Sequence, residues 1–370
     1  MKIARIRTLR LATSLDPPFY AAWDPVPRTA FEATLVFVET DEGITGVGSG
    51  DVMDGFDRYE HLFVGEDALA IDRHVRVLET ITFHAGRYWP VEAALWDLAG
   101  KAEGRATAEV LDGPADGRLP AYASCGELKG PEQRAESALA LREEGFRALK
   151  LRIERGRIEE GVAAVAAVRD AVGDSMEIAV DLNQGWRMPG DLSAPLDRDA
   201  VRRLASELAE LGIMWLEEPL PGEDVHGLAA LRRESGLRIA GGEMARTVHE
   251  LDAYLAADAL DVYQPDAVLA VGITRGLEIA RRAHAEGRWF TPHTWTNGIG
   301  LLANLHMSAA AEAGPYVEFP YDPPGWTEER RDFMLAEPTR VDPDGCVAVP
   351  AGPGLGIELD DDALRRYVVT

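Results

Sequence analysis

Cysteine is scarce in this chain, and its scarcity excludes one class of architecture. Of 370 residues only two are cysteine, Cys125 and Cys346, too few for the disulfide framework of a small secreted protein. The N-terminal segment also lacks the uninterrupted apolar core of a secretory leader. It contains the cations Lys2, Arg5, Arg7 and Arg10. These features together predict a cytoplasmic protein.

Long apolar runs and positive charge are lacking as well. No apolar run is long enough to span a bilayer, so we expect no membrane segment. The 38 Lys and Arg residues are outnumbered by 63 Asp and Glu residues, which gives a formal net charge of -25. Long-range repulsion then opposes nucleic acid or an anionic membrane as a partner. A small anionic substrate would need local help from a metal ion or from buried cations.

The apolar content is ample for two structural units. With 370 residues, 46% of them hydrophobic, the chain exceeds what one core usually serves. Three β-forming stretches open the first unit and predict an antiparallel meander: 2–11, 30–40 and 44–50. Helical spacing follows over 68–111. Between the first two stretches, a predicted loop over 17–23 carries three aromatic residues, which either pack on their own domain or form a lid over a site.

From Leu119 onward the pattern changes to short apolar runs separated by amphipathic helices. The eight runs are 119–124, 148–153, 177–181, 213–217, 238–242, 260–264, 289–292 and 316–319. The helices between them include 131–144, 157–172, 198–211, 225–235 and 273–285. This α/β alternation favours a closed parallel barrel, although the count alone does not exclude a doubly wound open sheet. The predicted division is a first domain over 1–118, a barrel over 119–333, and a tail over 334–370 that returns to the first domain.

Acidic residues stand at the ends of three consecutive barrel strands. Asp181 ends the third run, Glu217 ends the fourth, and the fifth runs into Glu243. Any one of them alone is better explained as a strand-end cap or a salt bridge. Because the carboxyl ends of parallel strands share one face of a barrel, three together would repel one another unless a cation neutralised them. Oxygen ligands suit Mg²⁺, so the pattern predicts a magnesium site.

Cations and a possible base occupy neighbouring strands. Lys150 and Arg152 are two residues apart, so both side chains point to one face of their strand, where they either pair with barrel acids or sit beside a bound carboxylate substrate. Asp266 follows the sixth run and His293 the seventh; the carboxylate is placed to fix the imidazole tautomer and raise its basicity. Glu318, in the eighth run, is a candidate acid or hydrogen-bond partner. A metal, an anionic ligand and a base predict proton abstraction α to a carboxylate through an enediolate.

Short motifs around these residues resemble the enolase superfamily and, within it, the mandelate racemase group. The matching positions are Asp181 and Asn183 in Val-Asp-Leu-Asn-Gln, Glu217 in Trp-Leu-Glu-Glu-Pro, and Glu243 in Gly-Gly-Glu. The resemblance extends over nearly the full length. It implies a modified TIM barrel, (β/α)7β, with an α+β capping domain, and Mg²⁺ held by the three acids. A Lys or His base with Mg²⁺ is the known pairing in this superfamily.

The same resemblance implies roles for further residues. His293 and Asp266 would form a catalytic dyad, Glu318 would hydrogen-bond the substrate carboxylate, and Asn183 would lie at the substrate. Tyr20 and Trp23 would belong to a mobile loop that closes over the substrate. Substrate specificity is expected in the capping loops, with further candidates His84, Arg87, Tyr88 and Trp326, each of which either contacts substrate or packs structurally. Proteins of this kind commonly assemble as dimers or octamers, so a homo-oligomer is expected.

One position departs from the family pattern. The group usually carries Lys-x-Lys on the second barrel strand, whereas the second of these positions here is Arg152, and a guanidinium is a poor base. With His293 as the one clear base, the sequence predicts dehydration of a sugar acid, an aldonate or aldarate, to a 2-keto-3-deoxy acid. Lys150 as a second base would keep racemase, epimerase or lactone cycloisomerase activity open. A barrel that binds a ligand without catalysis is the remote alternative.

Overall fold

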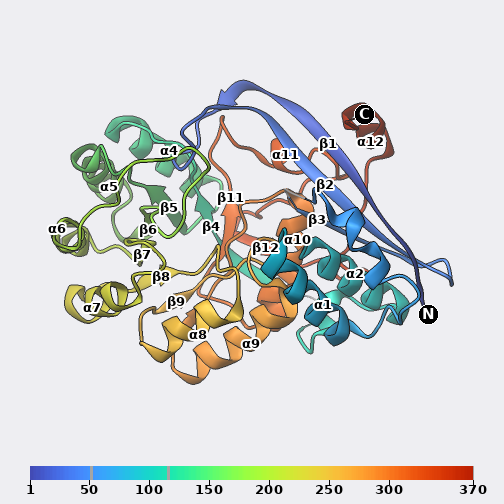
Figure 1. Cartoon of the computed structure of the whole chain (residues 1–370). Coiled ribbons are helices and arrows are strands. Elements are labelled where there is room, and N and C mark those ends of the chain that lie inside the picture. Colours follow the sequence, from blue (N-terminus) through green and yellow to red (C-terminus); the bar gives the residue numbers. More distant parts are fainter. Residues whose placement is uncertain (51–52, 115–116, 370) are drawn as a thin grey trace.

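An antiparallel sheet forms the N-terminal part of the protein. The computed structural model describes residues 1–50, 53–114 and 117–369. Strands β1 (Ile3–Phe19), β2 (Arg28–Thr40) and β3 (Thr45–Gly50) lie in that order, as the predicted meander requires (Figure 1). The predicted loop over 17–23 begins only at Tyr20, because β1 continues through a register shift to Phe19. Only 20–27 connect the two long strands.

Helices cover one face of this sheet. Two short 3-10 turns, η1 (Phe56–Arg58) and η2 (Glu60–Leu62), precede α1 (Ile71–His84), α2 (Pro90–Glu103) and α3 (Thr107–Val110). Helix α2 packs directly on β3, where a Cβ at Gly48 would lie 2.1 Å from the carbonyl oxygen of Pro90. Glycine at this position therefore permits the close approach of helix and strand.

The central part of the chain is a parallel α/β barrel. The described residues contain eight parallel strands of this barrel: β4 (Arg118–Ser124), β5 (Ala148–Arg152), β6 (Glu177–Asp181), β7 (Leu216–Glu217), β8 (Ile239–Gly241), β9 (Val262–Tyr263), β10 (Trp289–Phe290) and β11 (Val317–Pro320). The helices between successive strands are α4 (Pro131–Glu143), α5 (Ile158–Val172, followed by η3, Gly173–Ser175), α6 (Arg198–Glu210), α7 (Val225–Ser235), α8 (Val248–Ala256), α9 (Gly272–Ala285) and α10 (Gly298–Ala310). This order confirms the (β/α)7β barrel and excludes the doubly wound alternative.

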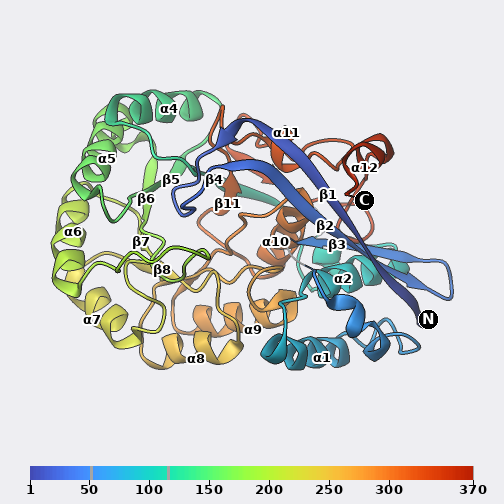
Figure 2. The same cartoon turned by 45° about the horizontal axis from the view of Figure 1, so that its top comes forward.

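The strands follow one another around the barrel in chain order. Each strand from β4 to β10 pairs with the next, and β11 returns to pair with β4. Between β10 and β11, Gly314 donates its backbone N–H to the carbonyl of Phe290 at 3.1 Å, and Thr291 Oγ1 donates to the carbonyl of Tyr316 at 2.7 Å. In Figure 2 helices α4 to α9 form an arc outside the strands. All the parallel strands therefore end at one face.

The C-terminal segment touches both parts of the molecule. After α11 (Glu328–Arg331), β12 (Cys346–Ala348) pairs antiparallel with the start of β4. Helix α12 (Asp361–Tyr367) lies beside β1, where Val369 donates its backbone N–H to the carbonyl of Arg10 at 2.9 Å. Among the residues described, no helix combines the length and the apolarity needed to cross a membrane.

A buried glutamate ties the N-terminal helices to the barrel. Glu92 on α2 is fully buried, and its Oε1 accepts the backbone N–H of Thr274 in the first turn of α9 at 2.8 Å. Gly272 begins α9 with a φ of 83°, and a Cβ there would lie 1.9 Å from Oε2 of Glu92. The glycine is thus required by the carboxylate that caps this helix from another part of the chain.

Candidate active site

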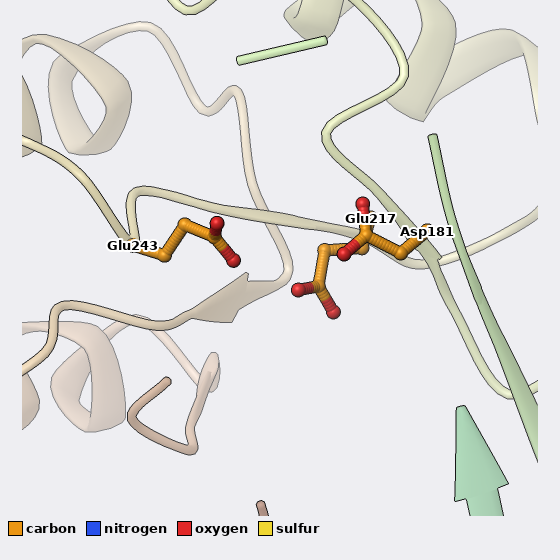
Figure 3. Close-up of side chains that lie close together, drawn as sticks. All are labelled: Asp181, Glu217 and Glu243. Carbon is orange, nitrogen blue, oxygen red and sulfur yellow. The ribbon is translucent and has the colours of Figure 1, made fainter. Parts of the chain in front are cut away.

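Three carboxylates from neighbouring strands meet at the carboxyl end of the barrel. Asp181 is the last residue of β6, Glu217 the last of β7, and Glu243 follows β8. One oxygen from each lies within 4.8 Å of the others, and all three side chains are buried (Figure 3). Gly242, with a φ of 94°, makes the turn that carries Glu243 toward the other two. The structure thus brings together the three acids that the sequence singled out.

Burial makes this acidic cluster electrostatically unfavourable. It raises the pKa of Asp181 to about 8 and raises that of Glu243, because neither charge is hydrated. Oε2 of Glu243 is buried and has no hydrogen-bond partner among the residues described, whereas Oε1 accepts the indole N–H of Trp186 at 2.6 Å. Hard carboxylate oxygens in this arrangement fit a divalent cation such as Mg²⁺, which would neutralise the cluster and provide a partner for the free oxygen.

Lys150 and Arg152 on β5 lie against the same cluster. The Nζ of Lys150 is 2.6 Å from Glu217, 2.8 Å from Glu318 and 3.7 Å from Asp181. Arg152 contacts Asp181 through Nη1. Burial by itself would lower the pKa of both cations, but the surrounding carboxylates outweigh it and raise both values. Both side chains are therefore paired with barrel acids and protonated.

Asn183 lies beside Asp181, but the two residues are not alternate positions of one strand. Strand β6 ends at Asp181, and Asn183 adopts the left-handed region with a φ of 44°. Its backbone N–H donates to Oδ1 of Asp181 at 2.7 Å, and its side-chain amide donates to Oδ2 at 3.1 Å. Its own Oδ1 accepts from Nη1 of Arg152 at 3.0 Å. The strained residue thus orients both the acid and the guanidinium.

His293 and Asp266 form a hydrogen-bonded pair across the site. Nδ1 of His293 lies 3.0 Å from Oδ2 of Asp266, whose Oδ1 accepts the backbone N–H groups of Val268 and Leu269 at 2.7 and 3.0 Å. Nε2 is the free nitrogen, 3.8 Å from Oε2 of Glu243. Burial would lower the pKa of His293, but nearby carboxylates, Glu243 foremost, raise it to about 9. The fixed tautomer leaves Nε2 facing the acidic cluster.

Glu318 is held as an anion partly by residues that the sequence alone did not single out. Its carboxylate accepts from Ser124 Oγ at 2.7 Å and from the backbone N–H of Thr294 at 2.8 Å, besides its ion pair with Lys150. Burial would raise the pKa of Glu318, but the cations around it lower it to about 2. Ser124 is the last residue of β4, so the strand-end rule that identified Asp181 would have identified it too. Trp295 also donates to Ser124 Oγ, at 2.7 Å.

The hairpin between β1 and β2 reaches the site with one of its two predicted residues. The Trp23 ring lies 4.7 Å from that of Trp295, and the guanidinium carbon of Arg152 lies 4.8 Å from the Trp23 ring centre. Tyr20 is on the surface with 58% of its area exposed. Backbone hydrogen bonding between Ala22 and Gly126, at 2.8 Å, anchors the hairpin next to β4. Trp23 therefore covers the site, whereas Tyr20 does not contribute a wall.

A cavity of about 370 Å³ adjoins the acidic cluster. Arg152 and Asn183, which contact Asp181, line it together with Trp23; the connection between β1 and β2 and the loops after β5 and β6 form the rest. The other residues expected to control specificity do not line it in the described structure: His84, Arg87, Tyr88 and Trp326. Trp326 is buried against Phe19 at 5.0 Å, and Tyr88 donates to the carbonyl of Asp54 at 2.6 Å. These two are packing residues rather than cavity walls.

Comparison with known proteins agrees with this geometry. Residues 133–363 match the family described as "Enolase C-terminal domain-like". The chain belongs to the enolase superfamily. Its D-galactarolactone cycloisomerase relative from Agrobacterium fabrum is 30% identical over 99% of both chains. The L-talarate/galactarate dehydratase of Salmonella typhimurium is 28% identical over 98% of this chain and 89% of its own length.

Solved structures of enolase-superfamily proteins superpose over the whole chain. A superfamily member from Polaromonas sp. JS666 has a TM-score of 0.86 and 28% identity, with 100% of this chain and 98% of its own covered. A racemase from Streptomyces coelicolor A3(2) with bound magnesium has a TM-score of 0.82 and 29% identity, with 99% and 100% covered. The protein is therefore an enzyme of the lyase or isomerase class within the enolase superfamily, as the sequence predicted.

In this enolase-superfamily protein one arginine connects the N-terminal part to the site. Arg87, between α1 and α2, donates through Nη1 to the carbonyl of Met244 at 3.0 Å and to that of Leu269 at 2.7 Å. Met244 follows Glu243 directly, and Leu269 lies three residues after Asp266. Arg87, a candidate for either substrate contact or packing, joins the two loops that carry a cluster acid and the partner of His293.

Proposed function

We propose that the protein is a Mg²⁺-dependent sugar-acid dehydratase, which removes the proton α to a carboxylate and expels the β-hydroxyl to give a 2-keto-3-deoxy acid. The supporting observation is that Nε2 of His293 has no hydrogen-bond partner among the described residues and lies 3.8 Å from Glu243, whereas Lys150 and Arg152 are held in close ion pairs. Two-base racemisation needs a proton carrier on each side of the α-carbon. A single base suffices for elimination on one face.

Asp181, Glu217 and Glu243 are the residues that would hold the ion. When bound, Mg²⁺ supplies electrostatic stabilisation of the charge that develops on the substrate carboxylate. Magnesium in the similar racemase structure and the unpartnered Oε2 of Glu243 support this assignment. Lys150 and Arg152 add positive charge at the same place, which lets an acidic protein accept an anionic substrate.

His293 carries out both proton transfers in the proposed reaction. Nε2 takes the α-proton, and the C–H electron pair moves into the carboxylate to form an enediolate. The bond from the β-carbon to its oxygen then breaks, and the imidazolium returns the proton to the leaving oxygen on the same face. Water and an enol result, and the enol tautomerises to the keto acid. Asp266 keeps the proton on Nδ1, so that Nε2 is the nitrogen that reacts.

Lactone cycloisomerisation is the second candidate. Similarity to the cycloisomerase of Agrobacterium fabrum favours it, since that relative matches this chain over 99% of both lengths. The residue chemistry is the same: His293 removes the α-proton, and the leaving β-oxygen is that of the lactone ring instead of a hydroxyl. Ring opening then gives an isomer of the substrate rather than loss of water.

The test is a panel of aldonates, aldarates and their lactones incubated with the purified protein and Mg²⁺. Keto-acid formation with a product lighter by one water supports dehydration, and a keto acid of unchanged mass supports cycloisomerisation. His293→Asn should abolish both, while His249→Asn, whose side chain is 93% exposed, should retain activity. Exchange of the α-proton for solvent deuterium without any keto acid would favour a racemase or epimerase, and exchange retained in His293→Asn would identify Lys150 as a base.

A further inference from the structure

The cavity beside the acidic cluster is lined by two arginines in addition to Arg152. Beyond Arg152 and Asn183 it is lined by Arg155 on the loop after β5 and by Arg187 on the loop after β6. Arg155 is three residues along the chain from Arg152, so their Cα atoms are at most ~10 Å apart. Because both side chains line the same cavity, one ligand held there can lie beside both arginines.

The guanidinium of Arg155 is held in place by one nitrogen, while another nitrogen lacks a hydrogen-bond partner among the described residues. Its Nη2 forms an ion pair with Asp191, which fixes the guanidinium, and 18% of the side chain is exposed. Its Nη1 is buried and has no hydrogen-bond partner in the described part of the chain. A buried N–H group without a partner is unfavourable, and it is satisfied by an acceptor on a ligand. Nη1 of Arg155 therefore retains the capacity to donate a hydrogen bond to a ligand oxygen.

Arg187 adds a second charge that is not neutralised by an acid. It donates through Nη1 to the backbone carbonyl of Ser193 in its own loop, and it forms no ion pair among the residues described. Asp24 and Glu154 are the other acids that line the cavity: Asp24 pairs with Arg28 at 2.9 Å, and Glu154 is exposed. Among the residues described, Arg187 is therefore the cavity arginine whose guanidinium has no acidic partner.

We infer that Arg155 and Arg187 bind a second, terminal carboxylate of the substrate, so that the enzyme acts on sugar diacids (aldarates or their lactones) in preference to aldonates. This inference rests on the proposed sugar-acid function. Guanidinium groups match carboxylates in shape and charge, and a diacid needs such local cations because the protein's net charge of -25 repels it. An aldonate ends in a hydroxymethyl group, which gives Arg187 no carboxylate partner and Nη1 of Arg155 no anionic acceptor.

Matched substrate pairs test the inference. Each aldarate is compared with the aldonate of the same hydroxyl configuration, for example galactarate with galactonate, in the presence of Mg²⁺. The wild-type ratio of kcat/KM should favour the aldarate, and Arg155→Gln and Arg187→Gln should each lower that ratio on the order of 10- to 100-fold. Arg157→Gln is the control, because Arg157 is on the same loop but is exposed and paired with Glu160 outside the cavity.

Binding separates this inference from the proposed reaction. Isothermal titration of the Mg²⁺-loaded protein with the same pairs should show tighter binding of the aldarate, even if no pair is turned over; that result would retain the diacid site and reject the dehydratase. Equal binding and equal kcat/KM of aldarate and aldonate would overturn the inference. Equal losses on both substrates in Arg155→Gln would also overturn it, since a merely structural arginine has that effect.

Discussion

Glu92 makes a contribution to the free energy of unfolding that decreases as the pH rises through neutrality. Its carboxyl is fully buried, and burial raises its pKa from 4.5 to about 7 despite hydrogen bonds from the first turn of α9. A carboxyl with a raised native pKa binds protons more tightly in the folded state than in the unfolded state. Its contribution is therefore fully present below about pH 4.5 and is lost as the pH rises through about 7.

The expected magnitude follows from these two values. One pKa unit corresponds to about 1.4 kcal/mol, so a change from 4.5 to about 7 corresponds to about 3 kcal/mol, most of it lost between about pH 5 and about pH 8. Glu92→Gln resembles the protonated carboxyl and cannot ionise. The free energy of unfolding of this variant, relative to wild type, should therefore rise by about 2–3 kcal/mol over that interval.

Urea unfolding at fixed Mg²⁺ concentration measures the effect. We compare three proteins at about pH 5 and about pH 8: wild type, Glu92→Gln and the control Glu103→Gln. Only the differences between proteins are interpreted, because other groups also titrate over this interval. Glu103 is on the same helix α2 but is exposed, so its variant should follow wild type. Parallel pH profiles for wild type and Glu92→Gln would refute the assignment of a raised pKa to Glu92.

Three further predictions concern the site. Mg²⁺ at a concentration about 100 times its dissociation constant should stabilise the wild-type protein by about 2.7 kcal/mol, measured by thermal unfolding. The variant Glu243→Gln should lose most of this stabilisation. If the variant is stabilised as much as wild type, Glu243 is not a ligand. The value of kcat/KM should rise with pH as His293 loses its proton, with a midpoint between pH 6.5 and about 9. The midpoint is expected below about 9 because a cation bound at Glu243 offsets part of the electrostatic attraction between Glu243 and the imidazolium, which raises the pKa of His293. A fall of kcat/KM over this pH range would contradict the role of His293 as a base. Ser124→Ala should cost about 1–3 kcal/mol of stability and lower kcat, since Glu318 and Trp295 lose a buried partner; unchanged kcat would limit Ser124 to a structural role.

Hydrophobic periodicity predicted the barrel because each helix between strands presents one apolar face. Strand β6 was predicted with its observed bounds, 177–181, and α7 likewise, 225–235. Helices α8 and α10 were not identified individually. Nearly every residue of α10 is buried, so it has no polar face to reveal its period. Strand β1 was predicted too short, since prolines near its end suggested a loop while its partner β2 supports the extension.

The sequence predicted those site residues that stand at the end of a barrel strand. Asp181, Glu217 and His293 were identified by their positions at strand ends, and the geometry brings them together. Trp186 and Arg155 were not identified, because both lie in loops. Hydrophobic periodicity does not predict the conformation of a loop, so it does not show which loop side chains lie near the site. For Arg87 the sequence left a substrate contact and a structural role open, and the structure favours the structural role, because its Nη1 donates to two backbone carbonyls.

The hydrogen bonds of Arg87 limit how freely the parts of this enzyme could be exchanged. A cap that only covered the substrate could be swapped between relatives to change specificity while the chemistry stayed intact. Here the same cap braces the loops that follow Glu243 and Asp266, and Glu92 caps α9 from α2. A chimaera with a foreign cap would therefore need an arginine and a glutamate at the equivalent places, and recombination breakpoints that ignore them should yield folded but poorly active hybrids.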